Sequence, residues 1–230
     1  LLAINGQKRS PAFQNPGGLA GVWAEENTRD SIFNAIKRRE TFATSGPRII
    51  PRFFSSWDSM ENWCEDPELI SKAYGSGVPM GGNLEKNVLQ TSPHFLVSAT
   101  ADPGTDEFPG GLLQEIQIIK SWLGTDDQFH YKVISVAGGK NNGASVDSAT
   151  CKPIGRGEKA LCGTWQDPDF DPTLDAVYYS RVVENTSCRW SAHLCLQLDP
   201  SKRPDACDSN QIPKVIQERA WTSPIWYSAY

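Results

Sequence analysis

The sequence predicts a mainly β protein: an antiparallel β-sandwich from about residue 47 onward, preceded by a short αβ unit. Segments with alternating apolar residues recur along the chain, and turns rich in glycine separate them. The clearest strand patterns are 95–100, 114–123, 129–137, 176–183 and 220–227. Spaced strands with little helix between them are typical of a sandwich of two antiparallel sheets.

The αβ unit occupies residues 17–46 and consists of a loop, a capped helix and a short strand. Asn27 or Thr28 can accept a hydrogen bond from the first helical turn, and Asp30 suits the positive end of the helix dipole. The expected apolar stripe of the helix consists of Ile32, Phe33 and Ile36. Residues 41–44 then change to β-type side chains, so one helix and one strand come before the sandwich.

The composition is that of a folded globular protein. The chain has 230 residues, of which 39% are apolar, enough for a full hydrophobic core. Its net charge is −5 and its longest run of Lys or Arg has three residues, which argues against a nucleic-acid partner. No apolar run approaches the roughly 20 residues of a membrane span. Because the chain begins at Leu1 without a signal peptide, we expect a fragment or a processed product of a longer protein.

Six cysteines suggest an exported protein, and five of them fall within residues 151–207. No pair has C-x-x-C spacing, so we expect disulfides in an oxidising compartment, periplasmic or secreted, rather than a thiolate metal site. Buried free thiols are the alternative. The first expected bridge is Cys151–Cys162, whose short loop contains proline and glycines, and the second is Cys195–Cys207.

Motifs for catalysis are missing from the sequence. Its three histidines, His94, His130 and His193, are each more than 30 positions from the next, and neither H-x-H nor H-E-x-x-H occurs. There is no G-x-S-x-G nucleophile elbow, and the glycines at 138–139 do not have P-loop spacing. We therefore expect no catalytic residue, no bound cofactor and no transition metal in this chain.

Two other features leave alternatives open. Asp167, Asp169 and Asp171 alternate as in half of a calcium loop, but the twelfth position is Tyr178 instead of glutamate, so an acidic turn is the favoured interpretation over a calcium site. Eight tryptophans are numerous enough for a carbohydrate-binding module. Because three of them lie in strand patterns, core packing is the favoured use. These three are Trp122, Trp221 and Trp226.

Several segments, in the same order along nearly the whole chain, resemble a bacterial domain-of-unknown-function family, number 3604, allied to the PHP (polymerase and histidinol phosphatase) metal-dependent phosphoesterases. The longest is GGLAGVWAEENTRDSIFNAIKRRETFATSGPRI at 17–49. The others are GVPMGG at 77–82, LLQEIQIIKSW at 112–122, DPDFDP at 167–172 and ERAWTSPIWY at 218–227.

The resemblance implies a distorted α/β barrel with a metal site, followed by a β-sandwich. Residues 1–46 would then be the last helix and strand of the barrel, and residues 47–230 the C-terminal sandwich domain. The H-x-H and D-x-H motifs that hold the metal in such barrels would lie upstream, and any divalent metal with them. We therefore expect a non-catalytic C-terminal fragment, structural or accessory to the missing N-terminal barrel, with that barrel as its partner and a homo-oligomer as a further option.

The resemblance also implies residues near the transition from barrel to sandwich that could contact a ligand. Thr44 and Ser45 would lie closest to the mouth of the barrel, although a plain Ser-Gly-Pro turn is the simpler interpretation. The full set of ligand-binding candidates is Glu25, Glu26, Arg29, Thr44, Ser45 and Arg48. Two other hypotheses stay open, namely a free-standing carbohydrate-binding module and a small hydrolase whose site we do not recognise.

Overall fold

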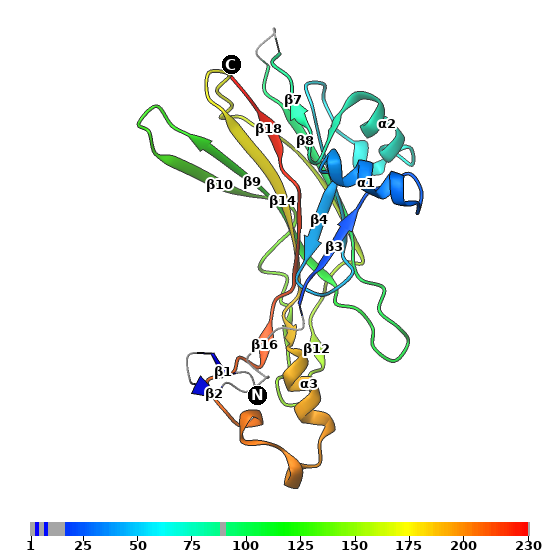
Figure 1. The fold of residues 1–230 in the computed structure, drawn as a ribbon, viewed down its shortest axis with the longest axis vertical. Coiled ribbons are helices and arrows are strands. Elements are labelled where there is room, and N and C mark those ends of the chain that lie inside the picture. Colours follow the sequence, from blue (N-terminus) through cyan, green and yellow to red (C-terminus); the bar gives the residue numbers. More distant parts are fainter. Residues whose placement is uncertain (1–2, 5–6, 9–16, 88–90, 230) are drawn as a thin grey trace.

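Two mainly antiparallel sheets packed face to face form the larger part of the molecule, and a smaller lobe extends from one end of them (Figure 1). The computed structural model describes residues 3–4, 7–8, 17–87 and 91–229. Strands account for 39% of the structure and helices for 16%, which confirms the predicted mainly β class.

The larger sheet contains the longest strands. Its order is β10-β9-β14-β17-β4-β3, and β18 joins it by pairing with β14 and with β7. The strands are β3 (Leu19–Val22), β4 (Thr41–Thr44), β7 (Asn83–Leu84), β9 (Leu113–Leu123), β10 (Phe129–Gly138), β14 (Ala176–Glu184), β17 (Arg219–Thr222) and β18 (Ile225–Tyr227). The predicted αβ unit is therefore continuous with this sheet, because β4 pairs with β17. Of the predicted barrel segment 1–46, residues 1–2, 5–6 and 9–16 lie outside the described part.

The smaller sheet has the order β13-β8-β5-β6. Its strands are β5 (Ile50–Ser56), β6 (Val78–Pro79), β8 (His94–Thr100) and β13 (Ala160–Gln166). A second apolar cluster packs helix α2 (Leu69–Ser76) and the 3-10 turn Trp63–Glu65 on part of its outer face, through Phe54, Met60 and Leu96.

The core lies between the two sheets and follows from strand alternation. On β9, Ile116 and Ile118 point inward, and on β14 the inward set includes Tyr178 and Val182, all fully buried. Phe95 of the smaller sheet meets Tyr178 of the larger one with ring centroids 4.3 Å apart. The two inner faces therefore form a single apolar core.

Helix α1 (Arg29–Lys37) has the predicted N-cap, because the Thr28 side chain accepts a hydrogen bond from the Ser31 amide at 3.3 Å. Within the helix only Ala35 is buried. Two members of the predicted stripe face solvent: Phe33 is 63% exposed and Ile36 is 53% exposed. The helix is thus correctly placed, but two of the three residues of its apolar stripe face solvent and only Ile32 is partly buried.

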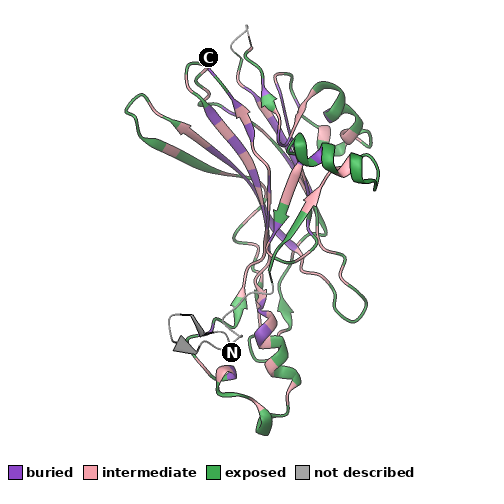
Figure 2. Ribbon diagram, viewed as in Figure 1, coloured by how far each residue is buried: buried purple, intermediate pink, exposed green. Residues whose placement is uncertain are grey.

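The lobe is built from short elements and two disulfides. Its elements are β11 (Ser145–Val146), β12 (Pro153–Ile154), β15 (Ser187–Cys188), α3 (Trp190–Gln197), the 3-10 turns Pro200–Lys202 and Asp205–Cys207, and β16 (Val215–Ile216). A further short pair, β1 (Ala3–Ile4) with β2 (Gln7–Lys8), completes the strands. Figure 2 shows that most of the lobe is exposed or only partly buried. Its described buried apolar residues are Cys188, Cys207 and Ile212.

All six cysteines form disulfides, but not all in the expected pairs. Cys195–Cys207 is confirmed. The predicted Cys151–Cys162 bridge is wrong, because Cys162 lies in β13 of the sandwich whereas Cys151 lies in the lobe. Cys162 instead bonds to Cys64, 98 positions away, and Cys151 bonds to Cys188 of β15. A short sequence loop was therefore a poor guide to which part of the molecule each thiol occupies.

Among the described residues, no helix is both long enough and apolar enough to cross a bilayer.

Candidate functional site

Three strand ends meet at the waist between the sandwich and the lobe. The Glu184 amide, at the end of β14, donates to the Glu218 carbonyl at 3.0 Å, just before β17 begins. The Ser45 amide, just after β4, donates to the Arg219 carbonyl at 2.9 Å. These backbone bonds bring Ser45, Glu184 and Glu218 to one place, which we call the waist site.

Ser45 is the predicted candidate that contacts this site directly. Its hydroxyl donates to the Glu218 carboxylate and accepts from the Arg219 amide at 2.8 Å. Thr44 is buried, and its hydroxyl accepts from the Gly46 amide at 3.2 Å, as expected of a turn. Ser45 therefore combines a turn position with a contact to a carboxylate.

Arg48 lies next to the same region and is paired with Asp102. The Arg48 amide donates to Asp102 Oδ2 at 2.7 Å, and the guanidinium lies 3.2 Å from Oδ1. Burial acts to raise the pKa of Asp102, but hydrogen bonds from Arg48 and Gly104 outweigh it and hold that pKa below its ordinary value. Asp102 is thus an ionised carboxylate whose partners are already present.

Glu184 is the unusual member of the waist site. It is only 3% exposed, and its Oε1 accepts no hydrogen bond from any described residue. The other carboxylate oxygen lies against Gly111, where an added Cβ would come within 2.5 Å of it. Burial, with the negative charges of Glu218 and Asp102, raises the pKa of Glu184 to about 7. This carboxyl group therefore changes protonation near neutral pH.

Sequence reasoning missed Glu184 although a signal was present. Along 176–184 the residues alternate, and Glu184 shares the inward parity of Tyr178 and Val182. A glutamate in an inward position of a strand is uncommon unless it is paired. Glu218 would still not have been found as its neighbour, because only the pairing of β14 with β17 brings the two together.

The remaining ligand-binding candidates lie elsewhere. Glu25 and Arg29 are exposed and come shortly after Val22, the last residue of β3. Val22 pairs with Thr41 at one end of the β3–β4 ladder. Thr44 pairs with Leu19 at the opposite end. Glu26 is also exposed and accepts a 3.4 Å hydrogen bond from the Thr28 hydroxyl. The predicted set is therefore split between the two ends of the β3–β4 hairpin.

The acidic turn at 167–171 is matched by lysines. Lys120 Nζ lies 2.5 Å from Asp167 Oδ2, and both groups are buried. Tyr178 donates to the same carboxylate at 2.7 Å, and Lys132 Nζ lies 2.6 Å from Asp169 Oδ2. Asp171 accepts from Thr173. Ammonium groups thus balance two of the three carboxylates considered as calcium ligands, an arrangement that favours the acidic turn.

One group of potential metal ligands is compact. Within the described ranges, the single set of three or more His, Cys, Asp or Glu side chains with ligand atoms within 4.8 Å of one another is Cys151, Cys188 and His193. The two sulfurs form a disulfide, so neither is a thiolate. His94 lies on β8 and His130 on β10, so the three histidines come from three separate elements.

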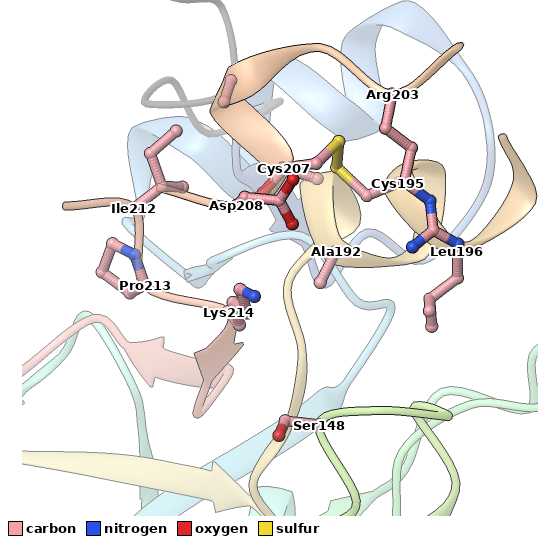
Figure 3. Close-up of a pocket in the computed structure, with 12 residues that line it drawn as sticks. Ser148, Ala192, Cys195, Leu196, Arg203, Cys207, Asp208, Ile212, Pro213 and Lys214 are labelled. Atoms are coloured by element: carbon pink, nitrogen blue, oxygen red, sulfur yellow. A yellow bond between two sulfur atoms is a disulfide. The ribbon is translucent and has the colours of Figure 1, made fainter. Parts of the chain in front are cut away.

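Two hollows lie away from the waist. Figure 3 shows the smaller one, beside the Cys195–Cys207 disulfide in the lobe, with a volume of about 80 Å³. Arg203, Asp208 and Lys214 contribute its charges. Since a water occupies about 30 Å³ in the liquid, this space is far below the size of a small-molecule site.

The larger hollow, about 440 Å³, lies on the outer face of the smaller sheet. Trp23, Ile50, Arg52, Ile70 and Leu161 are among its lining residues. The Arg52 guanidinium lies 3.5 Å from the centre of the Trp23 ring and donates to the Tyr74 hydroxyl at 3.1 Å. Arg52 therefore covers the ring face that a ligand would otherwise stack on.

All eight tryptophans are partly buried, and none belongs to the exposed class. Core packing is confirmed for Trp122. Trp221 and Trp226 instead alternate with the inward residues Ala220 and Ile225, so they lie on the outer face of the larger sheet, and Arg39 covers Trp226 at 4.9 Å. The row of exposed tryptophan rings that the carbohydrate-binding hypothesis requires is not formed.

Fold and site together define a disulfide-bonded β-sandwich protein with a buried carboxylate at its waist. Comparison of the sequence with family descriptions gives a match over residues 3–229 to "Protein of unknown function (DUF3604)". The chain belongs to the DUF3604 family. Neither a curated protein nor a solved structure matches it.

Proposed function

We propose that this chain is the non-catalytic C-terminal part of an exported, PHP-like metal-dependent hydrolase, in which it supports and covers a preceding barrel. The observation that carries the proposal is the exposed apolar stripe of α1. Phe33 and Ile36 are 63% and 53% exposed on a helix that the resemblance assigns to the end of the barrel.

The helix presents this stripe from a fixed position. Arg38 Nη2 donates to the Trp23 carbonyl at 2.7 Å, and Arg39 Nε donates to the Gly81 carbonyl at 3.0 Å. Each large apolar side chain gains about 1.5–3 kcal/mol when it is fully buried. Two adjacent exposed side chains of this kind on a helix anchored by these hydrogen bonds would favour an interface with another domain.

Two further features support the accessory role and the export. The three disulfides suit a periplasmic or secreted protein, since reducing compartments keep thiols free. The described histidines come from three separate elements, whereas a hydrolytic metal site needs several ligands at one point. The metal and the catalytic residues would then belong to the barrel.

The proposal is tested in two steps. The coding region upstream of Leu1 is expected to encode a barrel with an H-x-H motif; a region without one overturns the assignment. In the full-length parent, Phe33→Ser with Ile36→Ser should lower the melting temperature of the barrel and its hydrolysis of p-nitrophenyl phosphate. The control is Phe129→Ser, because Phe129 is 86% exposed on the β9–β10 hairpin. Equal effects of the two sets of substitutions would exclude α1 as the interface.

A further inference from the structure

We propose that the waist site binds a divalent cation of the oxygen-preferring class, such as Ca²⁺, through the carboxylates of Glu184 and Glu218 and the hydroxyl of Ser45. This inference goes beyond the accessory role proposed above and does not depend on it. It starts from the buried Glu184 Oε1, for which the described residues provide no hydrogen-bond donor.

The charges around Glu184 are unbalanced. Both groups whose charge acts on it, Glu218 and Asp102, are negative. The nearby cation Arg48 is already paired with Asp102 at 3.2 Å. A buried carboxylate is ordinarily paired, protonated or bound to a metal. Neither Glu184 nor Glu218 has an ion-pair partner among the described residues, so the waist site carries two uncompensated negative charges when both are ionised, which favours a divalent cation.

The ladder places the two glutamates opposite each other. Val183 pairs with Arg219, so Glu184 and Glu218 form the next pair along the two strands. Both residues are on the core-facing side of the sheet. Residues directly opposite in an antiparallel pair have Cβ atoms about 4.5–5.5 Å apart, and like charges there are destabilising. A cation between them converts that repulsion into shared coordination.

The ligand atoms suit Ca²⁺ in kind. Calcium takes about six to eight oxygen ligands in a flexible shell, so two carboxylates and a hydroxyl supply part of the shell and waters would supply the rest. Glu218 and Ser45 are only partly buried, so this side of the waist site reaches the protein surface. The missing side chain of Gly111 provides the room for the Glu184 carboxylate.

The position of the site gives the cation a structural task. β14 leads through Glu184 into β15 of the lobe, and β16 returns from the lobe through Glu218 into β17. Both connections between sandwich and lobe in this part of the chain pass the waist site. A bound ion therefore joins the two connections and limits motion of the lobe relative to the sandwich.

The test uses the purified chain at pH 8, where Glu184 is ionised. Calorimetric titration with CaCl₂ should show one equivalent bound, and the melting temperature should rise with the same saturation. Glu184→Gln should weaken binding at least tenfold, and Ser45→Ala several-fold. The matched control is Asp169→Asn, which alters the acidic turn at 167–171 and should leave the affinity unchanged.

Three results would overturn the proposal. The first is a wild-type protein that responds to pH but neither binds Ca²⁺ nor melts higher with it, which would make Glu184 a proton site only. The second is unchanged affinity in Glu184→Gln. The third is loss of binding in Asp169→Asn alone, which would move the site to the acidic turn. If Glu184→Gln fails to fold, Glu218→Gln replaces it under the same criteria.

Discussion

The sandwich and the lobe are both rich in short strands, yet they are held together by different forces. The sandwich buries a continuous set of large side chains, among them Phe53, Phe95 and Tyr178, at 0% exposure. The lobe buries few apolar groups and instead closes on Cys151–Cys188 and Cys195–Cys207. Small units that cannot build a sufficient core commonly depend on cross-links. The sandwich also carries a bridge, Cys64–Cys162, but beside a large apolar core, so reduction should disorder the lobe before the sandwich.

The largest expected effect comes from breaking the sandwich core. Phe95→Ala removes the ring that contacts Phe53, Trp165 and Tyr178, with centroid distances of 4.3–5.7 Å. We expect the free energy of unfolding to fall by about 3–5 kcal/mol, because a cavity replaces a fully buried ring. Urea denaturation of the variant and the wild type measures this loss of stability. In contrast, Phe129→Ala should change stability by about 0.5 kcal/mol or less, and a larger loss there would show that the hairpin surface is covered.

The complementary experiment breaks the lobe. Replacing Cys151 and Cys188 by serine opens a loop with a separation of 37 residues, and replacing Cys195 and Cys207 opens one of 12. In the chain-entropy picture these changes cost about 4 and about 3 kcal/mol. Limited proteolysis should cut the lobe and leave residues of the sandwich protected. Simultaneous loss of both regions would mean that they unfold as one unit.

The boundary between the two regions can be probed by pH. Because the pKa of Glu184 is raised to about 7 in the folded protein, the carboxyl group binds its proton more tightly when folded than when unfolded. Proton binding by Glu184 therefore adds to the free energy of unfolding. This contribution is fully present below about pH 4.5 and is lost as the pH rises through 7, and its upper bound is about 3 kcal/mol.

Glu184→Gln should therefore stabilise the metal-free protein at pH 8 and have little effect at pH 5. Denaturation of variant and wild type in parallel from pH 5 to pH 8 isolates this group from the other titrating residues. A stability difference that does not change with pH would contradict the assignment.

The smallest effect is expected at α1, outside both cores. Thr28→Ala removes the side chain that accepts from the Ser31 amide. We expect a cost of about 1 kcal/mol, confined to the first turn of the helix. Amide hydrogen exchange across 29–37 measures it. Unchanged protection would show that packing of Ala35 and the Arg38 and Arg39 contacts hold the helix without its cap.

The sequence carries the local part of this fold well. Strand alternation located β8, β9, β10 and β14, and the cap and charges located α1, because these signals lie within one element. Apart from the short-range bridge Cys195–Cys207, the cysteine pairing and the waist site could not be derived in the same way. Cys64 meets Cys162, and Glu184 meets Glu218, only through the pairing of distant strands, which alternation does not specify.

The order of the cysteines has a consequence for biogenesis. The pairs Cys64–Cys162 and Cys151–Cys188 are interleaved along the chain, so in a growing chain Cys64 meets Cys151 before its native partner Cys162. An oxidase acting on cysteines in order of appearance would join Cys64 to Cys151. Reaching the native pairs then requires attack by a free thiolate on that bond. Maturation of this protein should therefore depend on a disulfide isomerase, and its yield should fall in a host that has only the oxidase.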